Sequence, residues 1–507
     1  MPPTTMPELD ARRRTVIFCF LMLSMFMATL DTHVVSTALP TIIGEFGAIE
    51  RFGWIGSAYL LTQSTIMPVY GKLGDLFGRK YVMMSAVALF TLGSLACGMA
   101  WSMDSLIAAR MLQGLGAGGI MVSIFSINAD MFAPRLRARY QSFSSLVLMA
   151  SGSVGPALGG AMSEHFGWRS IFLINLPVGI AALTGLALLL PHWRPDRKPK
   201  IDYPGAATLA VAIAGVVLWA DARSLFGGMF TPVALLLPAA SALALWLWLR
   251  IERRAPEPII PLPLFGQRNF ALLLIVSVCT GGTAIGLVNY HALFLQMTTG
   301  LSPSAAGLFF IAVTGGIALG SLSAGRLIEK TGVYKPWLVC GLALSACCLA
   351  GLALLPLHAP FWLMAGLLLG QGVAIGLGQQ APVIGVQIAA PARDTGAATG
   401  SVTLARMGGA SLAISIYGAL LAAQLGAHAL PGLGAAAELP REQIAALPPA
   451  LRDAAAGAFN DAFTWVYTAA VVLVLIGLAA ALALKPVELA PARKPGGAQP
   501  DAVLAQR

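Results

Sequence analysis

The sequence predicts an all-α integral membrane protein with about fourteen transmembrane helices. Of its 507 residues, 57% are apolar and only 11% are charged, whereas soluble domains carry about 25% charged residues. A soluble chain of this length could not bury so much apolar surface, so lipid must be the solvent for most of it. The apolar residues also gather in runs of about 20, the length that crosses the hydrocarbon core as a helix. Finally, positive charges concentrate in alternate connecting segments, as they do in multi-pass membrane proteins.

The apolar runs fall into groups of six, two and six. They lie near residues 15–38, 53–70, 81–100, 105–127, 140–162, 169–190, 204–222, 231–249, 270–296, 303–323, 336–355, 360–380, 395–424 and 462–484. We therefore predict a six-helix N-terminal half over 15–190, a linker with two inserted helices over 191–269, and a six-helix C-terminal half over 270–485. Short segments, 1–14 and 486–507, flank this body.

The positive charges predict the orientation of the chain. Arg12, Arg13 and Arg14 precede the first run, which is longer than a signal-peptide core and is interpreted as a membrane span. With the N-terminus in the cytoplasm, 25 of the 32 Lys and Arg residues fall in cytoplasmic segments and five in outer ones. We therefore expect both termini and the 191–203 linker to be cytoplasmic. The same bias explains the net charge of +10, so a nucleic-acid partner is not expected.

A repeated motif relates the two six-helix groups. The segments 71–80 (GKLGDLFGRK) and 325–332 (GRLIEKTG) both match G-[KR]-L-x-[DE]-x-x-G and begin 254 residues apart. The pair Gln113-Gly114 also has an echo in Gln371-Gly372. Paired six-span halves are a transporter architecture, with the substrate site between the halves near the middle of the membrane.

Five segments of the N-terminal half together resemble the major facilitator superfamily, and in particular its fourteen-span drug–proton antiporters. They are segment 71–80, 30–40 (LDTHVVSTALP), 110–114 (RMLQG), 152–160 (GSVGPALGG) and 168–177 (WRSIFLINLP). The resemblance implies the major facilitator fold, and multidrug export across a bacterial inner membrane in exchange for protons. His33 and Ser36 stand where the family usually has Thr and Asn, so the identity of the cargo does not follow from the resemblance.

Asp31 is the candidate proton carrier. It is the only one of the 22 acidic residues that lies deep in a predicted span. A carboxylate there is costly and usually marks an ion or substrate path, and burial favours its neutral form. Arg110 has a matching depth in the fourth span at 1.5 Å per residue, so a purely structural ion pair is the alternative. Gln113 lies three residues further on, on the face of Arg110, and is a candidate for the substrate cavity.

Four other polar side chains in predicted spans are candidates for the substrate cavity. They are His33 in the first span, Asn289 and His291 in the ninth, and Arg406 in the thirteenth. His33 could instead be a packed, hydrogen-bonded histidine, and the ninth-span pair could serve ordinary helix–helix bonding. Arg406 lies too far from either surface to reach it easily, which favours contact with a cavity or with the other half.

The loop after the second span carries a candidate gate. Asp75 and Arg79 are four residues apart and can share a helix face, and Asp130 at the end of the fourth span is a possible partner of Arg79. Gly71 and Gly78 allow another helix to approach closely. The resemblance implies that this cluster latches the outward-facing state, whereas the alternative is that the charges only set the topology.

The fifth predicted span carries Gly152, Gly155, Pro156, Gly159 and Gly160. Small residues permit tight packing, and the proline removes a backbone hydrogen bond and bends the helix. The resemblance associates this motif with exporters, where it would shape gating; static packing is the alternative.

The function predicted from these features is proton-coupled export of small amphipathic drugs, cationic or neutral. The glycine-rich segment 114–119 lies inside an apolar helix with no preceding strand, so it is not a dinucleotide loop, and the chain carries no P-loop motif. We expect no metal and no cofactor, with the proton gradient as the energy source. A dedicated exporter of one metabolite is the alternative; an integral-membrane enzyme or sensor fits less well, because the spans hold few ionisable groups. The outer segment 425–461 carries no motif that identifies a periplasmic partner.

Overall fold

The computed structural model describes most of the chain. It covers residues 9–46, 52–192, 200–220, 222, 226, 228, 231–299, 301, 303–427, 429–430, 434–435 and 447–489. Parts of the predicted linker, outer segment and both termini therefore lie outside the described residues. The described residues confirm the all-helical fold class, with one small exception: Ala429–Leu430 (β1) pairs with Gly434–Ala435 (β2) in an antiparallel ribbon.

The N-terminal half is a bundle of long helices. Its elements are α1 (Ala11–Phe46), α2 (Phe52–Phe77), α3 (Arg79–Gly98), α4 (Met103–Met131), α5 (Pro134–Phe166), α6 (Ser170–Leu173) and α7 (Asn175–Leu189). Helix α4 packs on α2 and α3, α1 packs on α5, and α7 packs on α1 and α3. Ser102 caps α4 through a reciprocal capping box with Ser105, which satisfies backbone N–H groups at the helix start.

The C-terminal half repeats this arrangement. Its elements are α11 (Arg268–Ala284), α12 (Val288–Thr299), α13 (Pro303–Thr331), α14 (Lys335–Ala353), α15 (Phe361–Gln379), α16 (Ala381–Ala389), α17 (Thr395–Ala427) and α19 (Pro449–Leu482). Helix α15 packs on α13 and α14, α17 packs on α11, and α19 packs on α11 and α14. The final glycines of the two repeated motifs, Gly78 and Gly332, both have positive φ, 89° and 72°. Glycine adopts a positive φ at little cost, so each motif ends at a position that favours glycine.

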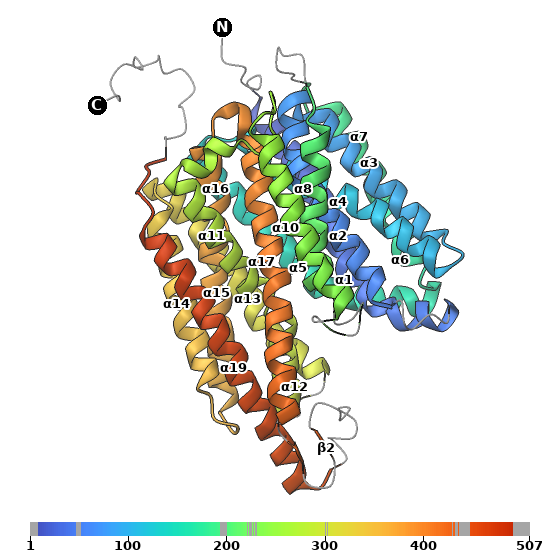
Figure 1. The fold of residues 1–507 in the computed structure, drawn as a ribbon, viewed down its shortest axis with the longest axis vertical. Helices are drawn as coiled ribbons and strands as arrows, with labels where there is room; N and C mark the ends of the chain where they lie inside the picture. The colour runs from blue at the N-terminus through green and yellow to red at the C-terminus, as the bar shows by residue number, and fades with distance from the viewer. Residues whose placement is uncertain are drawn as a thin grey trace.

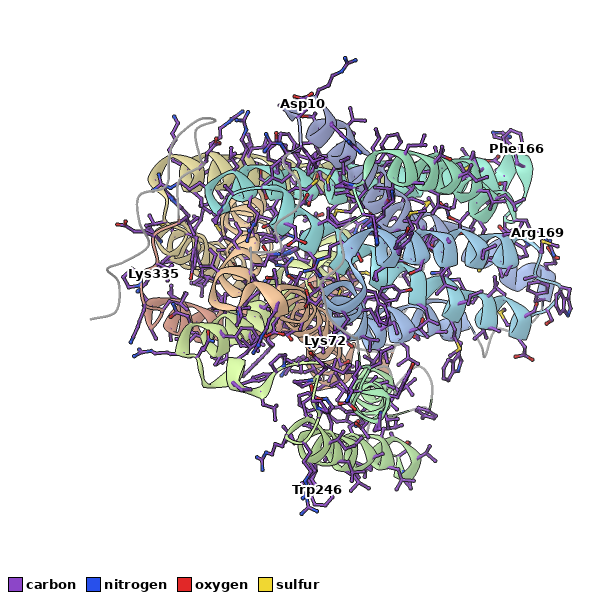
Figure 2. All side chains as sticks on the ribbon, turned by 90° about the horizontal axis from the view of Figure 1, so that it is seen from above. Asp10, Lys72, Phe166, Arg169, Trp246 and Lys335 are labelled. Carbon is purple, nitrogen blue, oxygen red and sulfur yellow. The ribbon has the colours of Figure 1, made fainter. Side chains whose placement is uncertain are left out.

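The two inserted helices lie on the outside of the junction between the halves. They are α8 (Tyr203–Ala220) and α10 (Pro232–Glu252), and they pack on each other. Helix α8 also contacts α2 of one half and α17 of the other (Figure 1). Figure 2 looks down the long axis: Lys72 lies near the junction of the halves, while Trp246 lies at the outer edge of the inserted pair.

One end of the molecule gathers the positively charged connections. Arg13 Nε donates to the carbonyl of Leu189 (3.0 Å), and Arg135 Nε donates to the carbonyl of Leu489 (2.8 Å). The first turn of α1 and the last described residues therefore lie at the same end. At the opposite end, Arg169 and Trp168 donate to Glu45, and these hydrogen bonds hold the pKa of the Glu45 carboxyl below its usual range.

The helices differ in detail from the predicted spans. Among the described residues, ten helices are long and apolar enough to cross a membrane, and 203–219 and 268–284 are shorter apolar helices. The predicted span 270–296 is broken between α11 and α12, next to Gly281, Gly282 and Gly286. Clustered glycines weaken a helix, and a Cβ on Gly281 would overlap the carbonyl of Arg406. The count of fourteen stays a prediction.

Reporter fusions test the predicted orientation. An alkaline phosphatase fused after residue 50, 230 or 440 should be active, because we expect these positions to face the periplasm. A green fluorescent protein fused at the C-terminus should fluoresce. A phosphatase that is inactive only after residue 230 would contradict the two-span insertion.

Candidate functional site

Asp31 lies at the centre of a buried polar network in the N-terminal half. Its Oδ2 pairs with Arg110 Nη1, and its Oδ1 accepts from Gln113 Nε2 at 2.8 Å. Arg110 Nη1 also donates to Gln113 Oε1 at 2.6 Å. The side chains of Asp31 and Arg110 are 0% and 2% exposed. The structure thus brings together three predicted residues, and it places Gln113 against the carboxylate.

Two members of the network were not predicted as site residues. Asn175 Nδ2 donates to Asp31 Oδ1 (3.2 Å) and to Ser94 Oγ (3.0 Å), and Gln113 Nε2 also donates to Ser94 Oγ (2.5 Å). Both residues are buried. Asn175 was visible in the sequence as the one amide in its apolar span, whereas Ser94 resembles any small helix-packing residue. Together they give Asp31 a third donor and hold the Gln113 amide.

Arg110 is held on its other side by α2. Its guanidinium carbon lies 4.2 Å from the centre of the Tyr59 ring, and its Nε donates to the carbonyl of Ile55 at 3.3 Å. A cation over an aromatic face is stabilised by the ring quadrupole. These contacts hold the Arg110 guanidinium on several sides. The ion pair with Asp31 therefore has little freedom to move while the helices are packed around it.

Glycines let the helices carrying this network approach closely. A Cβ on Gly93 of α3 would lie 2.6 Å from Gln113 Cα. A Cβ on Gly114 would overlap Thr62 Oγ1 and the carbonyl of Tyr59. Larger residues at either position would separate α4 from α3 or α2, and the short hydrogen bonds to Asp31 would be lost.

His33 packs against the glycine motif of α5. A Cβ on Gly155 would lie 2.5 Å from His33 Cβ, and one on Gly152 would lie 3.6 Å from its Nε2. Gly159 is buried, and a Cβ on Gly160 would meet no atom within 4 Å. The side chain of Pro156 lies outside the described residues. The motif thus supplies the close contact between α5 and α1 at His33.

His291 lies inside the C-terminal bundle. It is 2% exposed, its Nδ1 is 3.1 Å from Tyr467 Oη, and the two rings are stacked. Its Nε2 has no hydrogen-bond partner among the described residues. The side chain of Asn289 lies outside the described residues.

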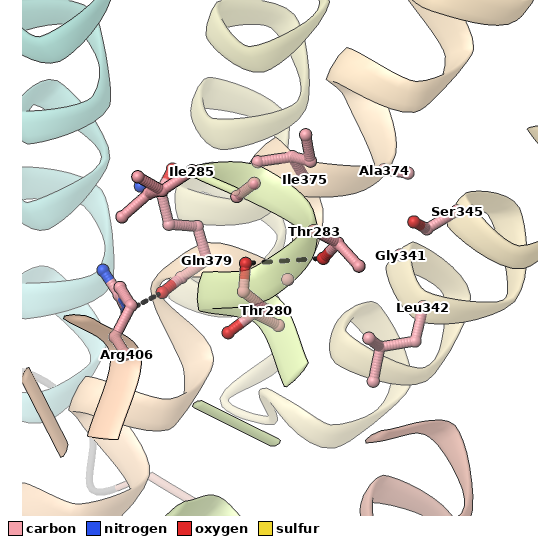
Figure 3. A pocket seen from close by; sticks show the side chains of 12 residues that line it. Thr280, Thr283, Ile285, Gly341, Leu342, Ser345, Ala374, Ile375, Gln379 and Arg406 are labelled. Carbon is pink, nitrogen blue, oxygen red and sulfur yellow. Dashed lines mark hydrogen bonds between the residues drawn. The ribbon is translucent and has the colours of Figure 1, made fainter. Parts of the chain in front are cut away.

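Arg406 lines a pocket within the C-terminal half (Figure 3). The pocket lies among α11, α14, α15 and α17, and Thr283, Ser345 and Gln379 are among its lining residues. Arg406 Nη2 donates to the carbonyl of Gln379 at 2.7 Å. This pocket and the Asp31 network are separate polar sites, one in each half.

The charged cluster after α2 joins the two halves. Arg79 Nη2 lies 2.6 Å from Asp75 Oδ1, and its Nε lies 3.0 Å from Asp130 Oδ2. Asp75 in turn accepts from the backbone N–H groups of Gly396 (3.0 Å) and Ala397 (2.9 Å) at the start of α17. A carboxylate at a helix N-terminus satisfies free N–H groups and complements the helix dipole. Three of the five predicted gating residues, Gly71, Asp75 and Arg79, therefore meet Gly396 of the C-terminal half. Asp130 holds Arg79 from within the N-terminal half, and Gly78 lies at the turn.

A lysine in the same loop extends the contact to the inserted helices. Lys72 Nζ lies 2.9 Å from Glu257 Oε2, just after α10, and 3.9 Å from Asp394 Oδ1, just before α17. Its side chain is only 4% exposed. Lys72 therefore contacts both the linker and the C-terminal half, a role that the motif alone did not predict.

The second copy of the motif occupies the equivalent place on the other side. A Cβ on Gly325 would lie 2.7 Å from Ser142 Oγ of α5, and Arg139 of α5 lies 3.7 Å from Glu329. Near them, Gln380 Nε2 of the C-terminal half donates to Ser145 Oγ at 3.0 Å. Both motifs thus pack on the opposite half, and this end of the molecule is closed.

Comparison with known proteins identifies the family. Residues 21–414 match the sequence profile of the Major Facilitator Superfamily. The chain is 34% identical over 95% of its length to an uncharacterised MFS-type transporter of Mycobacterium tuberculosis, covering 71% of that protein. It is 30% identical over 82% of its length to the multidrug transporter protein MdtP of Bacillus subtilis, covering 76% of that protein.

Solved structures show the same fold at lower sequence identity. The human organic anion transporter MFSD10 superimposes with a TM-score of 0.59 at 16% identity, over 92% of this chain and all of that one. A bacterial homologue of the human lysosomal transporter Spinster, in an inward-facing unoccupied conformation, gives a TM-score of 0.55 at 18% identity, over 94% and 98% of the two chains. At these identities the match concerns the fold alone.

Proposed function

This chain belongs to the major facilitator superfamily and is a multi-pass membrane transporter, and we propose that it exports small amphipathic molecules, cationic or neutral, in exchange for protons. We place it in a bacterial inner membrane with both termini in the cytoplasm. MdtP of Bacillus subtilis, at 30% identity, is a multidrug transporter, which supports drugs as the cargo. No enzyme activity is part of this proposal.

The observation that carries the proposal is the buried Asp31–Arg110 pair. A carboxylate and a guanidinium removed from water are costly, and the pair is retained most readily where it has a function. Asp31 holds three donors in this state, from Arg110, Gln113 and Asn175. A proton on Asp31 cancels its charge and releases Arg110, so protonation and the arrangement of α1 and α4 are coupled.

This coupling can drive alternating access. Exchange requires that proton binding and cargo binding oppose each other. On the outer side, protons load Asp31 and favour cargo release; on the inner side, loss of the proton restores the ion pair and prepares the site. The cluster of Asp75, Arg79 and Asp130 would hold the cytoplasmic end closed during the outward-facing part of the cycle.

Proteoliposomes test the proposed exchange directly. Purified protein should move ethidium, a cationic amphipathic probe, against its gradient when a pH difference is imposed, and addition of ethidium should release protons from the protein. Collapse of the pH difference with a protonophore should stop the movement. Ethidium movement that does not depend on the pH difference but requires ATP or a sodium gradient would contradict the proposal.

A further inference from the structure

The pocket at Arg406 lies inside the C-terminal bundle. It has a volume of about 20 Å³ and is partly open to the exterior. Figure 3 shows Arg406 at one end, beside Gln379, and Ser345 at the other, with Ile375 and Leu342 on the walls between. The site therefore has one cationic end and a largely apolar lining.

Arg406 is a buried cation that lacks a counter-charge among the described residues. It is 7% exposed; among the described residues it donates only to the carbonyl of Gln379, and its Nε has no partner. No described carboxylate lies within ion-pair distance of its guanidinium group. An unpaired buried charge is strongly unfavourable, so the folded state gains when an anion completes the site.

The N-terminal half combines a similar serine–glutamine contact with an acidic residue. There, the amide of Gln113 donates to both Ser94 Oγ and Asp31, which also pairs with Arg110. In the C-terminal half Ser345 Oγ donates to Gln371 Oε1 at 3.0 Å, which repeats the serine–glutamine pair, but Gln371 Nε2 has no partner in the described part of the chain. The C-terminal half thus keeps the polar pair and has a buried arginine, and none of its described acidic residues pairs with either.

We infer that the missing counter-charge is a carboxylate of the cargo, so that the transporter binds amphipathic zwitterions of zero net charge, with the acid group at Arg406. An Arg guanidinium suits a planar carboxylate, because both present paired donors or acceptors in one plane. The apolar walls would receive the rest of the molecule. This inference rests on the proposed export function, whose cargo it specifies.

Equilibrium binding to purified protein in detergent tests the inference without any gradient. The probes are 2-naphthoate, which carries the carboxylate, and 2-naphthamide, which has the same ring and no charge. Because a hydrogen bond to a charged group contributes more than a neutral one, we expect naphthoate to bind about tenfold more tightly or better. Arg406→Gln should remove this preference and leave naphthamide binding unchanged. The control Arg254→Gln, at an exposed site after α10, should bind both probes as the parent protein does.

A second variant keeps the arginine and fills the pocket. Gly378 lines it, and a Cβ there would meet only Leu338 Cδ1, at 3.6 Å. Gly378→Leu should therefore fold and weaken naphthoate binding about tenfold, whereas Gly366→Leu, at an exposed position of the same helix, should not. If Arg406→Gln does not fold, Gly378→Leu and its control Gly366→Leu still test whether naphthoate binds in this pocket.

Two results would overturn the inference. Equal binding of naphthoate and naphthamide by the parent protein would show that no carboxylate site exists. Full displacement of naphthoate by phosphate or chloride at equal concentration would show a site for inorganic anions. Neither result bears on proton coupling, and an Asp31 variant that no longer exchanges protons should still bind naphthoate.

Discussion

Asp31→Asn should reach the membrane but lose gradient-driven export. Asparagine keeps the shape of the aspartate and can still accept from Gln113 and Asn175, but it has no charge to pair with Arg110 and no proton to exchange. Export in proteoliposomes should therefore fall to the level of empty vesicles, and ethidium should no longer release protons. Asp31→Glu should keep some activity, because it keeps the titratable group.

The stability of the variant must be separated from its chemistry. Removing one partner of a buried ion pair costs about 3–5 kcal/mol, because the other charge is left uncompensated. The double variant Asp31→Asn, Arg110→Gln removes both charges, so its thermal stability should recover while its proton coupling remains absent. Arg110→Ala alone should also fail to export. If Asp31→Asn exchanges cargo for protons at the normal rate, the carrier lies elsewhere, and His33 and His291 are the next residues to test.

Arg79→Ala should reduce transport about tenfold or more while leaving insertion intact. The change removes the two carboxylate contacts that hold Asp75 and Asp130 in place, and buried charged hydrogen bonds contribute about 1.5–3 kcal/mol each. Asp75→Asn should also reduce transport, because it weakens the contact with Gly396 and Ala397 of α17. Thr399 is buried at this end. A cysteine placed there should react faster with a membrane-impermeant maleimide, added from the cytoplasmic side, in the Arg79→Ala protein than in the parent protein.

Lys80→Ala is the matched control for this prediction. Lys80 is adjacent in sequence and equally positive, but it donates to the carbonyl of Ala187 within the N-terminal half. It therefore contributes to topology, and among the described residues its hydrogen bond stays within its own half. Loss of transport in Lys80→Ala as in Arg79→Ala, with unaltered cysteine labelling in both, would mean that the loop is a topological anchor.

Much of the fold follows from one-dimensional patterns. Apolar run length and the repeated motif predicted two related bundles, because crossing lipid and ending a helix at a glycine are local requirements. The depth match of Asp31 and Arg110 followed from the helical rise of 1.5 Å per residue, which places two residues at one level when their helices are neighbours. In the same way, Asp130 closes α4 at the level of Arg79.

The remaining contacts depend on angles and on distant segments. The sequence shows Ser94 as a small residue in an apolar helix, and only the packing of α3 on α4 turns it toward Gln113. Asp75 caps a helix that begins 320 residues later, and Lys72 meets Glu257 across the inserted pair. The break after α11 depends on how α17 packs against its glycines, which no local pattern encodes.

The close contact between Gly71 and Gly396 makes the opening of this end of the transporter an all-or-none event. Each glycine is so close to the other's carbonyl that a Cβ on either would overlap it, and the adjacent N–H groups of α17 reach Asp75 directly. Dispersion contacts lose about a quarter to a half of their energy when atoms separate by 0.5–1 Å, and hydrogen bonds weaken steeply when their angle is lost. A partial slide of α2 along α17 would thus weaken both kinds of contact without forming new ones. The transporter should dwell in discrete conformations separated by a sharp barrier, and single-molecule distance traces across this end should show two-level jumps with no gradual drift.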